Sequence, residues 1–243
     1  MKKLLIRQPA GMGDIFLCLK IAKKYQEKGY EIIWPINDDY MYLNDYLDID
    51  FKFIPISSQF LGKDFITLNV MSIVDSPDLL FLPLEVASFI VGNPIMNAKY
   101  RLAGVDIEDY LDYFNFKRDP RRESNLFFNQ LDLLDGVSTY RVNNKNFGTY
   151  PDVRKFDKSF IDSKENLYNI DMYLGDKKSH IFDWCSTIEK SKEFHTVGTS
   201  ITFIAEKLNV NNTKLFMYRR TGTSLEQFYD DKKLFKKNWT FIE

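Results

Sequence analysis

The first 36 residues alternate between strand and helix patterns, and this alternation constrains the fold more than any other feature of the chain. We expect an apolar strand at about 3–7, an amphipathic helix at about 14–28 and a buried strand at 30–36. Gly29 stands where the glycine that ends a helix belongs. A strand, a helix and a second strand within so short a stretch predict a parallel crossover.

The remainder of the chain continues the alternation in both halves. After the first crossover we expect strands at 51–56 and 64–70, a strand running into a helix at 78–92, and a largely helical segment at 96–136 that Pro120 interrupts. The C-terminal part predicts strands at 138–144, 166–174, 193–198, 214–220 and 238–242, with helices at 181–192 and 199–208. The pattern is typical of α/β architecture, in which helices flank parallel sheets.

Composition narrows the class of protein. A length of 243 residues with 44% hydrophobic residues suits two domains or one large α/β domain. The net charge of −1 and a pI near 6.2 give no positive field for nucleic acid or a membrane surface. Cys18 and Cys185 lie among apolar residues, which favours buried thiols in a reducing compartment. With no signal peptide pattern and no membrane-spanning stretch, we expect a cytoplasmic protein.

The first strand leaves through the turn Gly-Met-Gly-Asp, which suggests a ligand site. A dinucleotide fingerprint would need a third glycine where Phe16 stands, and a Walker loop would need Gly-Lys-Ser/Thr. We therefore interpret Gly11 and Gly13 as residues that bend the backbone and leave room for a bulky ligand. Asp14 could simply cap the helix. It could also accept a proton from a sugar hydroxyl, because the helix dipole favours a charged carboxylate there.

A second junction of the same kind follows the strand at 193–197. Gly198 makes the turn, and Thr199 and Ser200 open a helix whose free N–H groups suit a phosphate. Simple capping of that helix by either hydroxyl is the alternative. His195 lies in the strand just before the turn, as a packed residue or a ligand contact. Arg219 follows the next strand, where it could neutralise a phosphate.

Two segments, each containing one of these junctions, resemble a known family. Residues 3–36, KLLIRQPAGMGDIFLCLKIAKKYQEKGYEIIWPI, resemble the opening of GT-B-fold glycosyltransferases, especially the lipopolysaccharide heptosyltransferase group. Residues 193–218, EFHTVGTSITFIAEKLNVNNTKLFMY, are similar to the donor-site segment of that group. The resemblance implies an α/β protein of two Rossmann-like halves whose parallel sheets face a central cleft, GT-B-like but shortened. Residues 1–118 would form the acceptor-side domain and 119–243 the donor-binding domain.

The resemblance also implies roles for single residues. Asp14 would be the base that activates the acceptor hydroxyl, and Gly11, Gly13 and Arg7 would shape the acceptor-side loop. In the C-terminal half, the residues that would bind the donor are Thr199, Ser200, Gly198, His195 and Arg219. The chain is shorter than we expect for that group, and we identify in it no mid-chain strand with a basic residue that would face the donor phosphates. The candidates to replace that residue are Arg118, Arg121, Arg122 and Arg219, although the first three also suit a solvated helix end.

The reaction implied is transfer of a sugar from a nucleotide sugar to a hydroxyl of a glycan or lipid-linked saccharide. Because helix N–H groups and arginine would hold the diphosphate, we expect neither a metal ion nor a cofactor. The chain has only two histidines, which excludes a histidine-rich metal site. Two alternatives stay open: another nucleotide-sugar enzyme of the same fold, such as an epimerase, and a nucleotide-binding or assembly protein without catalysis.

Overall fold

The computed structural model describes residues 1–57, 72–91, 95–136, 138–144, 166–170, 179–220, 224, 228 and 232–243. The chain divides into two compact units, Met1–Lys117 and Arg118–Glu243, which are considered separately below. The strand expected at 64–70 lies outside the described residues, as does the last part of the strand expected at 166–174.

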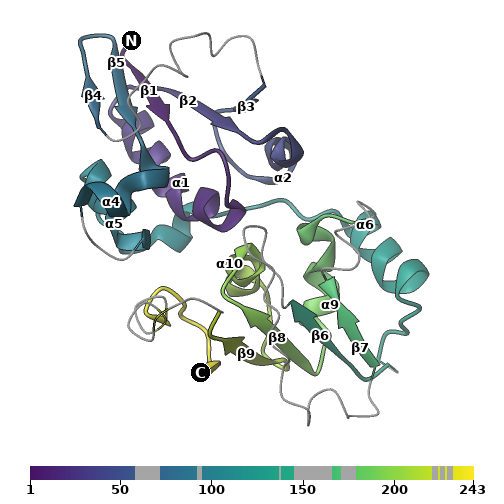
Figure 1. The fold of residues 1–243 in the computed structure, drawn as a ribbon. Coiled ribbons are helices and arrows are strands. Elements are labelled where there is room, and N and C mark those ends of the chain that lie inside the picture. The colour runs from purple at the N-terminus through teal and green to yellow at the C-terminus, as the bar shows by residue number, and fades with distance from the viewer. Residues whose placement is uncertain are drawn as a thin grey trace. The chain divides into compact units, whose positions relative to one another are not determined.

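The N-terminal unit is a five-stranded sheet with helices (Figure 1). Its strands are β1 (Lys3–Ile6), β2 (Glu31–Ile36), β3 (Phe53–Pro55), β4 (Val74–Asp75) and β5 (Leu79–Leu82). Its helices are α1 (Met12–Glu27), η1 (Asp38–Tyr40), α2 (Leu43–Tyr46), η3 (Leu84–Val86), α4 (Ala87–Val91), α5 (Ile95–Ala103) and η4 (Tyr110–Tyr113). The strand order is β3-β2-β1-β5-β4, and only β4 runs antiparallel to its neighbour.

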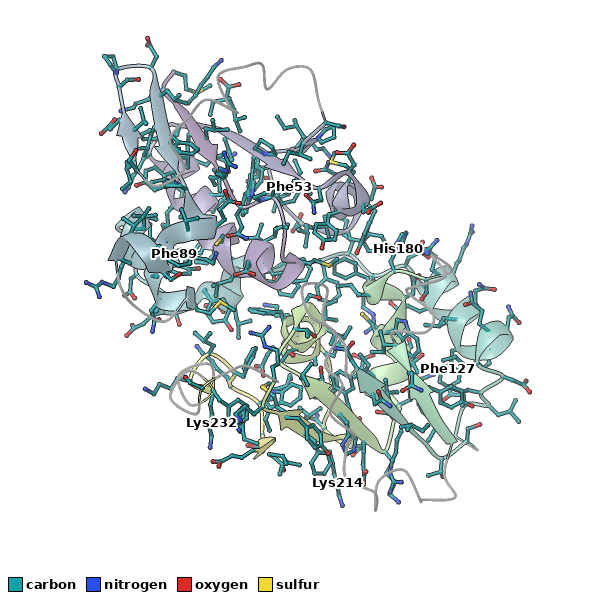
Figure 2. All side chains as sticks on the ribbon, in the orientation of Figure 1. Phe53, Phe89, Phe127, His180, Lys214 and Lys232 are labelled. Carbon is teal, nitrogen blue, oxygen red and sulfur yellow. The ribbon has the colours of Figure 1, made fainter. Side chains whose placement is uncertain are left out.

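Apolar burial explains why these segments take these forms. The side chains of Leu4 and Ile6 on β1 are fully buried, and so are apolar residues of α1 such as Ile15, which packs against β2 through its helix. Helix α5 packs against α1. Trp34 of β2 meets Phe53 of β3 edge to face with ring centroids 5.2 Å apart. Figure 2 labels Phe53 among the side chains of the N-terminal unit. An aromatic pair of this kind stabilises the pairing of two strands by more than the burial of its apolar area alone contributes.

The C-terminal unit repeats the plan with a sheet in which every described pairing is parallel. Its strands are β6 (Tyr140–Asn144), β7 (Asn166–Asn169), β8 (Glu193–Val197), β9 (Lys214–Tyr218) and β10 (Trp239–Ile242). Its helices are α6 (Pro120–Ser124), the π-helix η5 (Asn125–Gln130), η6 (Ile181–Trp184), α9 (Cys185–Glu189) and α10 (Ser200–Lys207). The strand order is β10-β9-β8-β6-β7. The expectation of an α/β protein with two units built on parallel strands is confirmed.

The segment expected to be largely helical at 96–136 is divided into short helices. Helix α5 ends at Ala103, and Pro120 begins helix α6 instead of interrupting a longer one. Asp119 caps α6, because its carboxylate accepts hydrogen bonds from the N–H groups of Arg121 and Arg122. A capping aspartate followed by proline at the first helical position is a start signal, which our interpretation missed.

Each sheet has one place where the direction of the strand order reverses. In the N-terminal unit the chain moves outward from β1 to β2 and β3, then returns to β5 on the other side of β1. In the C-terminal unit it moves from β6 to β7, then to β8 on the other side of β6. In open α/β sheets, ligands bind outside the carboxyl ends of the strands at such switch points. We therefore expect ligand sites at the carboxyl ends of β1 and β5 in the N-terminal unit, and of β6 and β8 in the C-terminal unit.

Candidate functional site

The turn after β1 places Asp14 in the first turn of α1 without making it the helix cap. Helix α1 begins at Met12, and its N-cap residue is Gly11, in the left-handed region with φ of 77°. Gly13 is the second residue of the helix and Asp14 is the third. A Cβ atom on Gly11 would collide with the Oδ2 atom of Asp14. The first glycine of the motif is thus required by its backbone angle and by the carboxylate packed against it.

A buried lysine is the polar partner of that carboxylate. The Nζ atom of Lys99, on α5, lies 3.3 Å from the Oδ1 atom of Asp14. The lysine side chain is only 2% exposed, whereas the aspartate side chain is 29% exposed. In the part of the chain that the structure describes, Lys99 is the one ion-pair or hydrogen-bond partner of the Asp14 side chain. Capping therefore does not account for Asp14, since its carboxylate pairs with a lysine.

The loop that follows β1 is bonded to η3, the short 3-10 helix that follows β5. The Lys99 ammonium also donates to the side-chain oxygen of Gln8 and, at 2.9 Å, to the backbone carbonyl of Leu84. Arg7 forms an ion pair with Glu85, and their backbones are joined by a hydrogen bond from the Glu85 N–H to the Arg7 carbonyl. These contacts gather the predicted residues Arg7, Gly11 and Asp14 at the β1–β5 switch point.

Asn144 links the two strands at the switch point of the C-terminal unit. It is the last residue of β6, and its Nδ2 atom donates to the Thr199 hydroxyl at 2.9 Å and to the Thr196 hydroxyl at 3.2 Å. Thr199 is the N-cap residue of α10, and its N–H donates to the Thr202 hydroxyl at 3.2 Å. Ser200 is the first residue of the helix. The predicted Thr199 and Ser200 thus stand at this edge, half-buried.

The other predicted donor residues occupy different surroundings. A Cβ atom on Gly198 would make only an ordinary contact with Met217, so packing within the chain does not demand glycine there. Arg219 directly follows β9, and its N–H donates to the Ile242 carbonyl at 2.8 Å. Its Nε atom is buried and has no hydrogen-bond acceptor within the described ranges. Arg219 is therefore a cation at the same edge with an uncommitted donor.

His195 is held inside the sheet. Its ring stacks on Phe216, with centroids 4.4 Å apart, and its nitrogens lie 2.9 Å from the Tyr218 hydroxyl and 3.1 Å from the Glu193 carboxylate. Burial lowers the pKa of His195 to about 4, although the bond to Glu193 acts in the opposite direction. A neutral ring with its proton on Nε2 satisfies both contacts. His195 positions its neighbours in the sheet, and its assignment to the donor stays a prediction.

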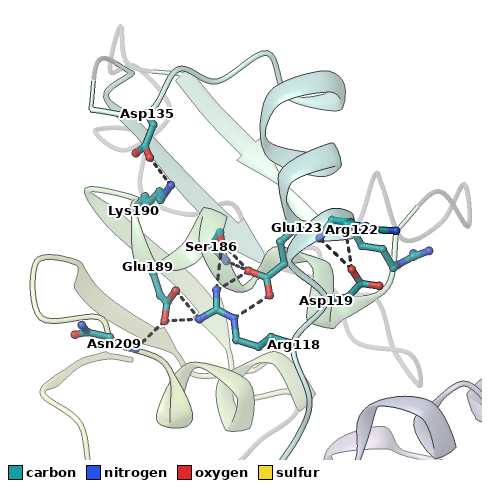
Figure 3. Close-up of polar contacts among 10 residues, drawn as sticks. Arg118, Asp119, Arg122, Glu123, Asp135, Ser186, Glu189, Lys190 and Asn209 are labelled. Atoms are coloured by element: carbon teal, nitrogen blue, oxygen red, sulfur yellow. Dashed lines mark hydrogen bonds and ion pairs between the residues drawn. The ribbon is translucent and has the colours of Figure 1, made fainter.

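Two of the arginines around Pro120, Arg118 and Arg122, bind carboxylates through their side chains, and Figure 3 shows the bonds of Arg118. Arg118 donates to Glu123 at 2.8 Å and to both oxygens of Glu189, at 2.8 and 3.0 Å. Arg122 binds Asp183 through two parallel hydrogen bonds of 2.7 and 2.9 Å. Arg121, whose side chain is exposed, contributes its N–H to the cap by Asp119. In the structure, therefore, Arg118 and Arg122 stabilise the packing of α6 against η6 and α9.

Three residues of these two edges were not identified from the sequence: Gln8, Lys99 and Asn144. Gln8 and Asn144 lie at or just after the carboxyl end of a strand next to the switch point, so the predicted strand ends carried a signal for them. Lys99 carried none. It lies in a helix among apolar residues, and only the three-dimensional packing of α5 brings its ammonium to the turn after β1.

The described ranges contain neither a metal-binding cluster nor a membrane-spanning helix. No group of three or more His, Cys, Asp or Glu side chains there is placed to hold a metal ion. Among the helices in those ranges, none combines the length and the apolar character that crossing a bilayer requires. Both cysteines are buried free thiols, and burial raises the pKa of Cys18 to about 12.

The sequence and the structure were compared with known proteins. No protein-family model matches the sequence, and no curated protein sequence does either. A family 9 glycosyltransferase from Veillonella parvula DSM 2008 aligns over 89% of this chain and 80% of its own, with 8% identity and a TM-score of 0.48. The E. coli ADP-heptose lipopolysaccharide heptosyltransferase II aligns over 90% and 85%, with 13% identity and a TM-score of 0.48.

A third solved structure belongs to the same class. The E. coli heptosyltransferase WaaC with ADP-2-deoxy-2-fluoro heptose aligns over 99% of this chain and 93% of its own, with 9% identity and a TM-score of 0.46. All three of these solved structures are glycosyltransferases, aligned with this chain at TM-scores of 0.46 to 0.48.

Proposed function

We propose that this protein is a glycosyltransferase that moves a sugar from a nucleotide-sugar donor to a hydroxyl acceptor. The observation that carries the proposal is the place of Asp14. A half-exposed carboxylate stands at the switch point of a parallel sheet, where this fold binds ligands, and a buried ammonium instead of a capping bond holds it. A carboxylate held in this way can accept the proton of a hydroxyl group in an acceptor.

The edge of the C-terminal unit supports the donor half of the proposal. The N–H group of Thr202 in the first turn of α10 bonds to Thr199 at the N-cap. The N–H groups that precede it at a helix start have no acceptor in the helix itself, and the positive dipole end favours a phosphate oxygen there. Arg219 adds a cation at this edge, directly after β9. Asn144 fixes the Thr199 hydroxyl at 2.9 Å, which prepares the turn for a ligand. Charge neutralisation by these groups would make a metal ion unnecessary.

The proposed reaction is a single displacement at the anomeric carbon of the donor sugar. Asp14 takes the proton from the acceptor hydroxyl, whose oxygen forms a bond to the anomeric carbon of the donor sugar. The bond from that carbon to the diphosphate oxygen breaks, and the nucleoside diphosphate leaves with its electron pair. The N-terminus of α10 and Arg219 stabilise the negative charge that the diphosphate gains. One displacement inverts the configuration at the anomeric carbon.

A nucleotide panel tests the proposal with the full chain. We expect ADP-, UDP-, GDP-, CDP- or dTDP-sugars of one base to raise the unfolding temperature, since a ligand at 100 times its Kd adds about 2.7 kcal/mol to the free energy of unfolding. The same nucleotide sugar should release its nucleoside diphosphate slowly with water as acceptor, in the presence of EDTA. Stabilisation by NAD in place of every nucleotide sugar would favour the epimerase alternative. No response to any of these ligands would refute the proposal.

A further inference from the structure

Lys99 is the least exposed charged residue at the β1–β5 switch point, and its contacts hold neighbouring segments of the chain together. Its ammonium has three oxygen partners, on Gln8, Leu84 and Asp14, which come from the loop after β1, the 3-10 helix η3 and helix α1. Gln8 and Leu84 accept hydrogen bonds from the ammonium, and the Asp14 carboxylate is its ion-pair partner. Burial of a lysine is costly unless such partners are present, so this arrangement fixes the ammonium at one point.

The asymmetry of the pair shows which partner is presented to solvent. The lysine side chain is 2% exposed and cannot reach a ligand, whereas Asp14 is 29% exposed. Oδ1 of the carboxylate faces Lys99, and Oδ2 occupies the space that a Cβ atom on Gly11 would need. The buried ammonium and the glycine therefore confine the carboxylate from two sides and leave its remaining surface open.

We propose that Lys99 is a positioning residue for Asp14: it holds the carboxylate in the orientation in which it accepts the proton of the acceptor hydroxyl. This inference rests on the proposed function, because a positioned base matters only if Asp14 acts on a hydroxyl. Small displacements of a catalytic group are costly to a rate, and a shift of about 1 Å lowers it by roughly 100-fold. Removal of the ammonium should therefore act on turnover more than on binding.

The chain supplies a matched control in Lys20. It is also a buried lysine of the N-terminal unit, and its ammonium donates to a backbone carbonyl, that of Glu108. It differs from Lys99 in having no contact with the carboxylate of Asp14. Lys20→Met therefore reports the cost of removing a buried ammonium from this unit, without a change at the turn after β1.

The experiment combines crystallography with kinetics on the full chain. Crystal structures of wild type, Lys99→Met and Lys20→Met should show that Asp14 leaves its wild-type rotamer only in Lys99→Met. Hydrolysis of the nucleotide sugar found in the panel should lose about 100-fold in kcat in Lys99→Met, with KM little changed. Lys99→Arg, which keeps the charge, should recover part of that loss, whereas Lys99→Gln should not.

Other results would overturn either the positioning role of Lys99 or the proposed function, and the two cases can be told apart. An unmoved Asp14 in Lys99→Met, or equal losses of kcat in Lys99→Met and Lys20→Met, would overturn the positioning role. If neither neutral variant folds, the wild-type crystal structure decides, since a carboxylate of Asp14 turned away from Lys99 excludes the role. If wild type turns over no nucleotide sugar, the proposed function fails, while the rotamer of Asp14 in the variants still answers the question about Lys99.

Discussion

At the scale of single residues, the turn Gly-Met-Gly-Asp is explained by one carboxylate. Gly11 is needed because its φ is 77° and because Asp14 fills the space that a side chain would take. The sequence alone predicted a special role for the turn and for Asp14, and it left capping open. The ion pair to Lys99 could not be predicted, because it joins residues far apart in the chain through the packing of α5.

The two demands on Gly11 can be separated by a matched pair of variants. Gly29 has a similar φ of 86°, but a Cβ atom there would meet nothing within 4 Å. We expect Gly11→Ala and Gly29→Ala each to lose about 1 kcal/mol of stability from backbone strain. Only Gly11→Ala should also displace the Asp14 carboxylate and lower turnover of a nucleotide sugar. Chemical denaturation and initial rates measure the two effects, and equal turnover in both variants would contradict this account of the turn.

At the scale of elements, the sequence predicted where strands and helices lie in the chain better than it predicted which strands pair with each other. The alternation of apolar segments located β1, α1, β2, β8, α10 and β9, since each is short, apolar and bounded by glycine or polar residues. The segment at 96–136 was misread, because its apolar content hid the start signal at Asp119 and Pro120. The pairing of β6 with β8, which brings Asn144 to Thr199, depends on strand order, which no local pattern contains.

The network around β8 predicts a pH dependence of stability. The pKa of His195 is lowered by burial from 6.5 to about 4 in the folded protein, so the unfolded chain takes up the proton first as pH falls. Stability is therefore lost between pH 6.5 and 4, and from pH 7 to 5 this residue alone should cost roughly 2 kcal/mol. Urea denaturation at both pH values measures it, and His195→Gln should remove most of the loss.

A second histidine provides the control for that measurement. His180 has a pKa lowered by burial and by the charge of Arg122, and it is more exposed than His195. His180→Gln should therefore keep most of the loss between pH 7 and 5. Burial raises the pKa of Glu193, but its contacts with His195 and Arg141 outweigh this and lower it below 4.5, so Glu193 responds at a lower pH. An unchanged pH dependence in His195→Gln would show that the ring is not buried neutral.

At the scale of the whole molecule, the sequence predicted two α/β units with parallel sheets, and it predicted one candidate edge in each. This was possible because crossovers of strand, helix and strand are encoded locally. Each edge lies at a switch point of its own sheet. The donor contacts proposed for Arg118, Arg121 and Arg122 could not be judged from sequence, since a basic cluster carries no sign of the carboxylates that Arg118 and Arg122 bind.

The most direct measurement compares donor binding with turnover, because the proposal assigns the base to the N-terminal unit and donor binding to the C-terminal unit. Asp14→Asn removes the proposed base from the N-terminal unit and leaves the proposed donor edge of the C-terminal unit intact. Asp78→Asn is the control, since it changes an exposed carboxylate before β5, at the opposite end of the strands. Donor affinity, turnover of the donor and stability are measured on both variants and on wild type. The account predicts that Asp14→Asn binds the donor with wild-type affinity, remains folded and loses roughly 100- to 10,000-fold in turnover, while Asp78→Asn behaves as wild type. Wild-type turnover by folded Asp14→Asn would contradict it.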